Sequence, residues 1–86
     1  MIDINKIGQL QEIFNKYKTD EIVGVWTDGV VETVVFTDSR DFKTVNKIMY
    51  AVADLFDIDK GEMAGGIFAT KYVSEFIGEE YGYYVD

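Results

Sequence analysis

An Asp-Gly pair between two β-rich runs is the feature that most restricts how this chain can fold. Asp28-Gly29 separates residues 21–27 from residues 30–37, and both runs are rich in valine, isoleucine, threonine and aromatic side chains. This pattern predicts an antiparallel β-hairpin closed by a two-residue type I′ turn, because that turn needs positive φ at both central residues.

The predicted turn also decides which side chains share a face of the hairpin. Trp26 would lie opposite Val31, and Val25 would lie opposite Glu32. Both faces then carry apolar side chains, so helices or a further strand must cover them, because a lone hairpin is marginal in water. Trp26 is expected in the core, since tryptophan is mostly buried.

Two amphipathic helices are predicted, one before and one after the hairpin. The first runs from about Ile4 to Lys18 with Asp3 as its N-cap, because its apolar residues recur at helical spacing. The second runs from about Arg40 to Phe56, and either Asp38 or Ser39 caps it. The residues of the second helix expected in the core are Phe42, Ile48, Val52 and Phe56.

The last third of the chain is less regular. A third helix is predicted within Ala64 to Gly78, although Gly65-Gly66 disfavours an early start, and a strand from Gly66 to Tyr72 is the alternative. Residues 81–86 either add an edge strand or stay mobile. The chain is therefore expected to be one compact α+β domain over residues 1–86: helix, antiparallel β-hairpin, helix, helix and an optional short C-terminal strand, with helices on one face of a small antiparallel sheet.

Histidine and cysteine are both absent, which removes the usual nucleophilic sites and zinc sites. We therefore expect no enzyme, no cofactor and no metal, although two carboxylates acting as acid and base remain an alternative. The acidic run from Asp57 to Glu62 does not fit a calcium loop, because glutamate stands at the sixth position and Phe68 at the twelfth. The glycines at 61, 65 and 66 lack the sequence of a phosphate loop and are expected to permit close backbone packing or a bend.

The net charge is −8, from 16 acidic and eight basic residues in 86. Such a chain is not expected to bind nucleic acid or an anionic membrane, because both need basic side chains. It suits a basic protein partner, which it can attract over long range. No secretory signal begins the sequence, so we expect a cytoplasmic protein, in a bacterium or an infected host cell.

The acids are concentrated towards the C-terminus. Residues 54–86 hold eight acids and two bases, a net charge of −6, whereas residues 1–53 carry −2. Tyrosines lie among these acids, and tyrosine beside carboxylate suits an interface with a basic groove. An acidic tail kept for solubility is the alternative. The predicted partner-binding residues are Asp54, Asp57, Asp59, Glu62, Glu75, Glu79, Glu80, Tyr81, Tyr83 and Tyr84.

In length, acidity, lack of cysteine and helix–hairpin–helix order, the chain resembles a class of small acidic inhibitors encoded by phages and mobile elements. Anti-CRISPR proteins and other nucleic-acid mimics belong to this class. The resemblance implies a protein that blocks the basic groove of a nuclease or another nucleic-acid-processing host protein. The alternatives are an immunity protein or antitoxin that neutralises a basic toxin, and a housekeeping regulatory domain whose charge serves solubility only. The oligomeric state stays open.

Overall fold

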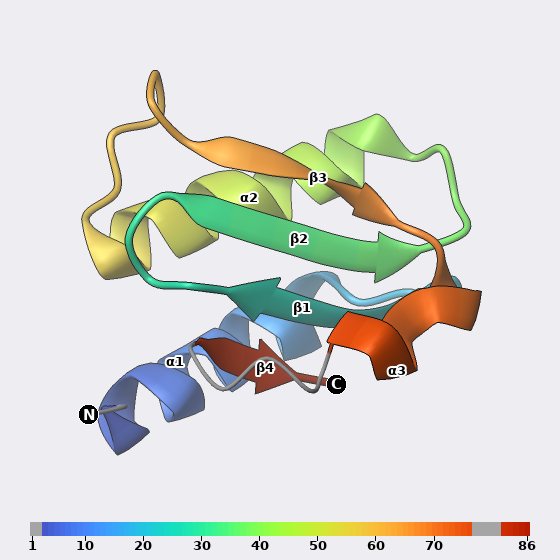
Figure 1. Ribbon diagram of the computed structural model, residues 1–86, viewed down its shortest axis with the longest axis horizontal. Helices are drawn as coiled ribbons and strands as arrows, with labels where there is room; N and C mark the ends of the chain where they lie inside the picture. The colour runs from blue at the N-terminus through green and yellow to red at the C-terminus, as the bar shows by residue number, and fades with distance from the viewer. Residues whose placement is uncertain (1–2, 77–81) are drawn as a thin grey trace.

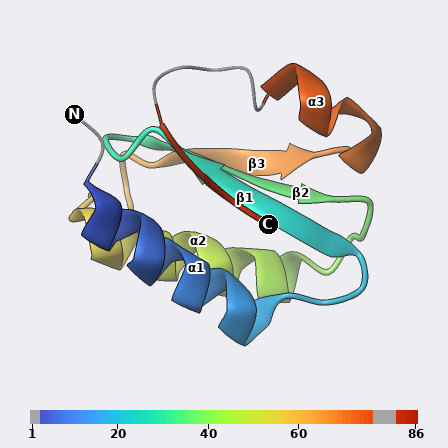
Figure 2. The same ribbon diagram turned by 90° about the horizontal axis from the view of Figure 1, so that it is seen from below.

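Two long helices lie side by side on one face of a mixed β-sheet (Figures 1 and 2). The computed structural model describes residues 3–76 and 82–86. Within these residues the sheet has four strands in the order β3-β2-β1-β4. The predicted α+β class is confirmed. The elements in chain order are α1 (Ile4–Tyr17), β1 (Ile22–Thr27), β2 (Glu32–Thr37), α2 (Phe42–Phe56), β3 (Ala64–Phe68), the 3-10 helix η1 (Thr70–Tyr72), α3 (Val73–Phe76) and β4 (Tyr83–Val85).

Helix α1 matches its predicted bounds to within one residue. Asp3 caps it by accepting a hydrogen bond from the Asn5 amide at 2.9 Å. The helix ends because Lys18 has an extended backbone, with ψ of 148°. Leu10 and Phe14 are its buried residues and face the core.

Helix α2 begins two residues later than predicted, and its cap differs. Asp41 is the N-cap, because its carboxylate accepts hydrogen bonds from the amide and the hydroxyl of Thr44 at 3.1 and 2.7 Å. The hydroxyl and then the amide of Thr44 hold the pKa of Asp41 below its ordinary value. The predicted cap Asp38 instead accepts hydrogen bonds from Thr70, beyond β3.

The predicted core residues of α2 are confirmed in the middle of the helix, but the prediction is wrong at its start. Ile48 and Val52 are completely buried, whereas Phe42 is 57% exposed. Phe42 is the first residue of the shifted helix and lines a surface hollow with Ile67 and Ala69. Phe56, at the other end, is only half-buried.

The antiparallel hairpin of β1 and β2 is confirmed, but the predicted register is wrong. Trp26 pairs with Val34, and Val25 pairs with Val35. The difference from the predicted register is an odd number of residues, which exchanges the two faces of one strand relative to the other. Trp26 therefore shares a face with Val34 and not with Val35.

The side chain of Asp28 is the reason for the longer loop. Its Oδ1 accepts hydrogen bonds from the amides of Val30, Val31 and Glu32, each at 2.9 Å. Gly29 has φ of 76°, but Asp28 does not have positive φ, so the two residues form no type I′ turn. Burial raises the pKa of Asp28, but the three amide hydrogen bonds outweigh it and hold the pKa below its ordinary value.

Both faces of the sheet are apolar, as predicted, and they are covered unequally. The face towards α1 and α2 holds the main core. The outer face holds a smaller cluster, built on Trp26, Val34 and Phe36, which the short helix α3 covers at one end (Figure 2). Trp26 is buried there, which confirms its prediction as a core residue.

The third helix predicted within Ala64–Gly78 forms only in the later part of that segment, as η1 and α3, and residues 77–78 lie outside the described residues. Ala64–Phe68 is a strand, β3, that runs parallel to β2, so the sheet is mixed and not purely antiparallel. The alternative strand from Gly66 to Tyr72 is nearer to the structure but starts and ends too late. Gly65 lies where a Cβ would come within 2.9 Å of the sulfur of Met49, so glycine lets α2 approach closely at that position.

The tail adds the edge strand that was one of its two predicted states. In β4, Val85 pairs with Val25 of β1, and Val85 is buried in the main core. The side chain of Gln11 on α1 donates a hydrogen bond to the Asp86 carbonyl at 3.2 Å, which ties the end of the chain to the helix layer.

Candidate functional site

One end of the molecule gathers segments that are far apart in the sequence (Figure 1). The rings of Phe56 and Tyr83 lie 4.8 Å apart and join the end of α2 to the start of β4. The Asp3 amide donates a hydrogen bond to the Tyr83 hydroxyl at 3.2 Å, which brings the start of α1 to the same place. A Cβ at Gly29 would lie 3.2 Å from both rings, so the β1–β2 loop closes over them.

We call this region the acidic end and define it as residues 3–6, 28–32 and 54–64. It holds seven acids and two bases, a net charge of −5. The other described residues hold seven acids and six bases, a net charge of −1. The fold therefore concentrates negative charge more sharply than the sequence order does. The acids of this end are Asp3, Asp28, Glu32, Asp54, Asp57, Asp59 and Glu62, and the bases are Lys6 and Lys60.

Both bases of the acidic end already contact groups within it. Lys60 forms an ion pair with Asp54 at 3.1 Å. Lys6 donates a hydrogen bond to the Leu55 carbonyl at 2.7 Å, near the negative end of the α2 dipole, and lies over the Phe56 ring. These contacts hold the cations against the end of α2.

The acids of this end fall into two groups. Asp3, Asp28 and Asp59 accept hydrogen bonds from nearby amides and so shape the local backbone. Glu32, Asp57 and Glu62 are exposed, and Asp57 also ends α2 in the left-handed conformation, with φ of 55°.

Two aliphatic side chains are exposed among these acids. Ile4, in the first turn of α1, is 81% exposed, and Val30, at the tip of the β1–β2 loop, is 75% exposed. Large apolar side chains within a charged surface are a feature of protein-binding sites, where they pack against the partner and are removed from water.

The structure brings together only some of the predicted partner-binding residues. Asp54, Asp57, Asp59 and Glu62 lie together at the acidic end. Glu75 lies apart from them on α3, which is on the other side of the sheet (Figure 2). Residues Glu79, Glu80 and Tyr81 lie outside the described residues.

The two remaining tyrosines of the predicted site point to opposite faces of β4. Tyr83 packs with the main core, and Tyr84 packs with the outer cluster, where its ring lies 5.6 Å from that of Phe36. Burial, and then the nearby Asp86 carboxylate, raise the pKa of Tyr84 above its ordinary value. Neighbours in a strand alternate between faces, so these tyrosines cannot form one contact surface.

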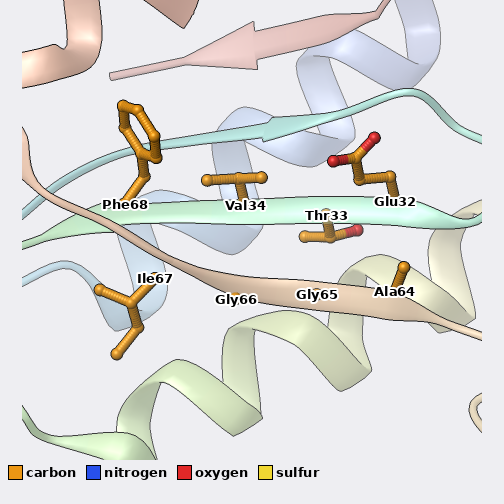
Figure 3. A pocket seen from close by; sticks show the side chains of 8 residues that line it. All are labelled: Glu32, Thr33, Val34, Ala64, Gly65, Gly66, Ile67 and Phe68. Atoms are coloured by element: carbon orange, nitrogen blue, oxygen red, sulfur yellow. The ribbon is translucent and has the colours of Figure 1, made fainter.

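The free edge of β3 is a feature that the sequence interpretation missed. A hollow of about 270 Å³ lies along β2 and β3. Figure 3 shows Glu32, Val34 and Phe68 projecting from one side of these strands, with no side chain at Gly66 between them. The signal was the Gly-Gly pair just before Ile67-Phe68, which we interpreted as disfavouring an early helix start, with a strand from Gly66 as the alternative.

Residues 3–76 and 82–86 contain no group of three or more acids placed to hold a metal ion. In the same part of the chain, no helix is long and apolar enough to cross a membrane. Comparisons with protein-family models, curated proteins and solved structures gave no match.

Proposed function

We propose that this protein binds a basic protein partner and blocks the groove with which that partner holds nucleic acid. The proposed class is the small acidic inhibitor of phages and mobile elements. The observation that carries the proposal is the acidic end, where seven acids meet two bases. Those acids come from segments widely separated in the chain, so the concentration of charge depends on the folded state.

The physical argument has two parts. A dense patch of carboxylates attracts a groove lined with lysine and arginine, and this raises the rate of association. The same patch presents negative charge as a phosphate backbone does, so protein and nucleic acid would compete for one groove. Ile4 and Val30 add apolar contacts that a nucleic acid lacks and that slow dissociation.

The experiment captures the partner from a host lysate and compares two double variants that carry the same net charge. Asp57→Asn with Glu62→Gln removes two charges from the acidic end. Asp20→Asn with Glu21→Gln removes two exposed charges outside it. We expect the first pair to slow association several-fold at low salt and to weaken its salt dependence, and the second pair to have little effect.

Two further results decide the case. Nucleic acid added to the complex should displace the protein, and the protein should displace nucleic acid from the partner. Equal association rates for the two double variants would contradict the acidic end as the contact surface. A partner that holds nucleic acid and this protein at once would exclude groove blocking, and a captured toxin would assign the protein to the immunity class.

A further inference from the structure

The outer edge of β3 is open. β3 is the last strand on its side of the sheet, and within residues 3–76 and 82–86 no strand pairs with its other edge. The Ala64 amide donates to the Val31 carbonyl at 2.9 Å, so Ala64 is bonded towards the sheet. Successive residues of a strand direct their amides to opposite edges, so the N–H and C=O groups of Gly65 and Ile67 point outwards.

This edge lacks the usual protection against pairing. Natural sheets block their edges with lysine, proline, bulges or very short strands. β3 has five residues, Ala-Gly-Gly-Ile-Phe, without lysine or proline, and its pairing with β2 is regular over all five positions. The edge is therefore ready to accept another strand.

Hollows lie on both sides of this edge. The outer-face hollow has Glu32, Val34 and Phe68 around Gly66. A Cβ at Gly66 would meet no atom within 4 Å, so packing does not require glycine there, and its absence of a side chain keeps the hollow open. A second hollow, of about 380 Å³, lies between the start of α2 and the end of β3 and includes Phe42 and Ile67.

The two hollows match the geometry of an added strand. An extended peptide alternates its side chains, so consecutive residues would enter hollows on opposite sides of the sheet. The outer hollow carries the exposed carboxylate of Glu32 and suits a lysine or arginine. The second has Phe42, Ile67 and Ala69 on its wall beside polar residues of the β2–α2 loop, and these three give an apolar contact for an aliphatic side chain. Phe42, which is 57% exposed, would gain burial by this contact.

We propose that the open edge of β3 binds an extended basic segment of a protein partner as an added β-strand. The proposal rests on the proposed function for the positive charge of the partner. A second copy of this chain is the other natural occupant of an open edge. Two copies would each bring a net charge of −8, so charge complementarity favours the basic segment.

The test uses a short synthetic peptide of alternating lysine and valine as the probe. One matched control is the same peptide with glutamate in place of lysine, and another has N-methyl groups on alternate residues, which remove backbone donors. We expect the lysine peptide to bind and both controls to bind about ten-fold more weakly or worse, the second because main-chain hydrogen bonds supply the affinity. The N-methyl groups can be placed on either of the two alternating sets of residues. If both of these peptides bind as tightly as the unmethylated peptide, strand addition is contradicted.

Variants of the protein locate the site. Gly66→Val fills the outer hollow while the strand keeps its backbone, so we expect it to weaken peptide binding about ten-fold or more without loss of thermal stability. Gly8→Ala, on α1, is the control, because a Cβ there also meets no atom within 4 Å, and it should bind as the natural chain does. Undiminished binding by a folded Gly66→Val protein would overturn the proposal.

The captured partner then separates this proposal from the proposed function. If Asp57→Asn with Glu62→Gln weakens partner binding and Gly66→Val does not, the acidic end is supported as the contact surface and strand addition at β3 is contradicted. Peptide and partner binding that Gly66→Val abolishes, with no effect of those two neutral substitutions, would support the edge and contradict the acidic end. If the protein alone forms a dimer that Gly66→Val dissociates, the edge of β3 binds a second copy of the chain, and this would contradict the proposal of a basic partner.

Discussion

The two outer strands of the sheet, β3 and β4, differ in how their side chains attach them to the rest of the molecule. β4 has only three residues, yet its side chains are anchored on both faces: Tyr83 and Val85 in the main core and Tyr84 in the outer cluster. β3 has five residues, of which two are glycine, and Ala64 and Gly65 are exposed. β4 is thus held by the side chains of all three of its residues. β3 is held only at its end, by Ile67 in the main core and Phe68 in the outer cluster, and it offers backbone at Gly65 and Gly66.

Glycine has a different meaning at each edge. Gly82, just before β4, has φ of 152°, and a Cβ there would lie 2.6 Å from the Trp26 ring nitrogen. Gly66 has neither constraint. Packing therefore requires glycine at position 82 but not at position 66. In our proposal, Gly66 keeps the hollow on the outer face open.

The largest expected effect is at the β4 edge. Gly82→Ala should lower the free energy of unfolding by about 3 kcal/mol, because the methyl group overlaps Trp26 and the backbone angle is unfavourable for alanine. Chemical denaturation followed by Trp26 fluorescence measures this change. A cost within experimental error would show that β4 is loosely attached and would remove the contrast between the edges.

Truncation of a β4 anchor should cost somewhat less. Val85→Ala removes two methyl groups from the main core, and we expect a loss of about 2 kcal/mol in the free energy of unfolding. Thermal and urea denaturation should agree on this value. If the variant is as stable as the natural chain, the core does not depend on β4.

The loop between the inner strands provides a third effect on stability. Asp28→Ala should cost about 1 to 2 kcal/mol, because three amides lose their acceptor. The folded-state pKa of Asp28 is lowered, so its contribution is present above the ordinary pKa of 3.8 and is lost as the pH falls through the lower folded value. The difference in the free energy of unfolding between the two proteins should therefore shrink in acid.

The smallest expected effect is at the β3 edge and has the opposite sign. Gly66→Ala should leave the free energy of unfolding unchanged or raise it by about 0.5 kcal/mol, because the backbone angle suits alanine and the space is empty. The same denaturation experiment measures it. A loss of more than about 1 kcal/mol would show that Gly66 is needed for packing, and its role in a binding hollow would lose its main support.

The parts of the fold that follow from local periodicity could be predicted from the sequence. Both long helices belong to this group, since their apolar stripes repeat at helical spacing and an aspartate caps each. The register of the hairpin does not, because the Asp28 side chain holds a longer loop than the Asp-Gly pair predicts. β3 was predicted only as an alternative and with late bounds, because it pairs in parallel with a distant strand, and its two glycines give no periodic signal.

The candidate site was predicted in its charge but not in its shape. The acids from Asp54 onwards were predicted as one group, and the fold keeps the four from Asp54 to Glu62 together but places Glu75 apart on α3. Asp3, Asp28 and Glu32 join them only through contacts between distant segments, which composition alone does not reveal. Tyr83 and Tyr84 were treated as one surface, whereas strand alternation separates them.

Amide hydrogen exchange at β3 tests the central claim most directly. In the free protein, the amides of Gly65 and Ile67 should exchange faster than those of Gly66 and Phe68, which face β2. Saturation with the lysine–valine peptide should slow exchange at Gly65 and Ile67 by about ten-fold or more, since the carbonyl groups on the facing edge of an added strand accept hydrogen bonds from these amides. Unchanged exchange at these two amides in the saturated complex would contradict strand addition at β3.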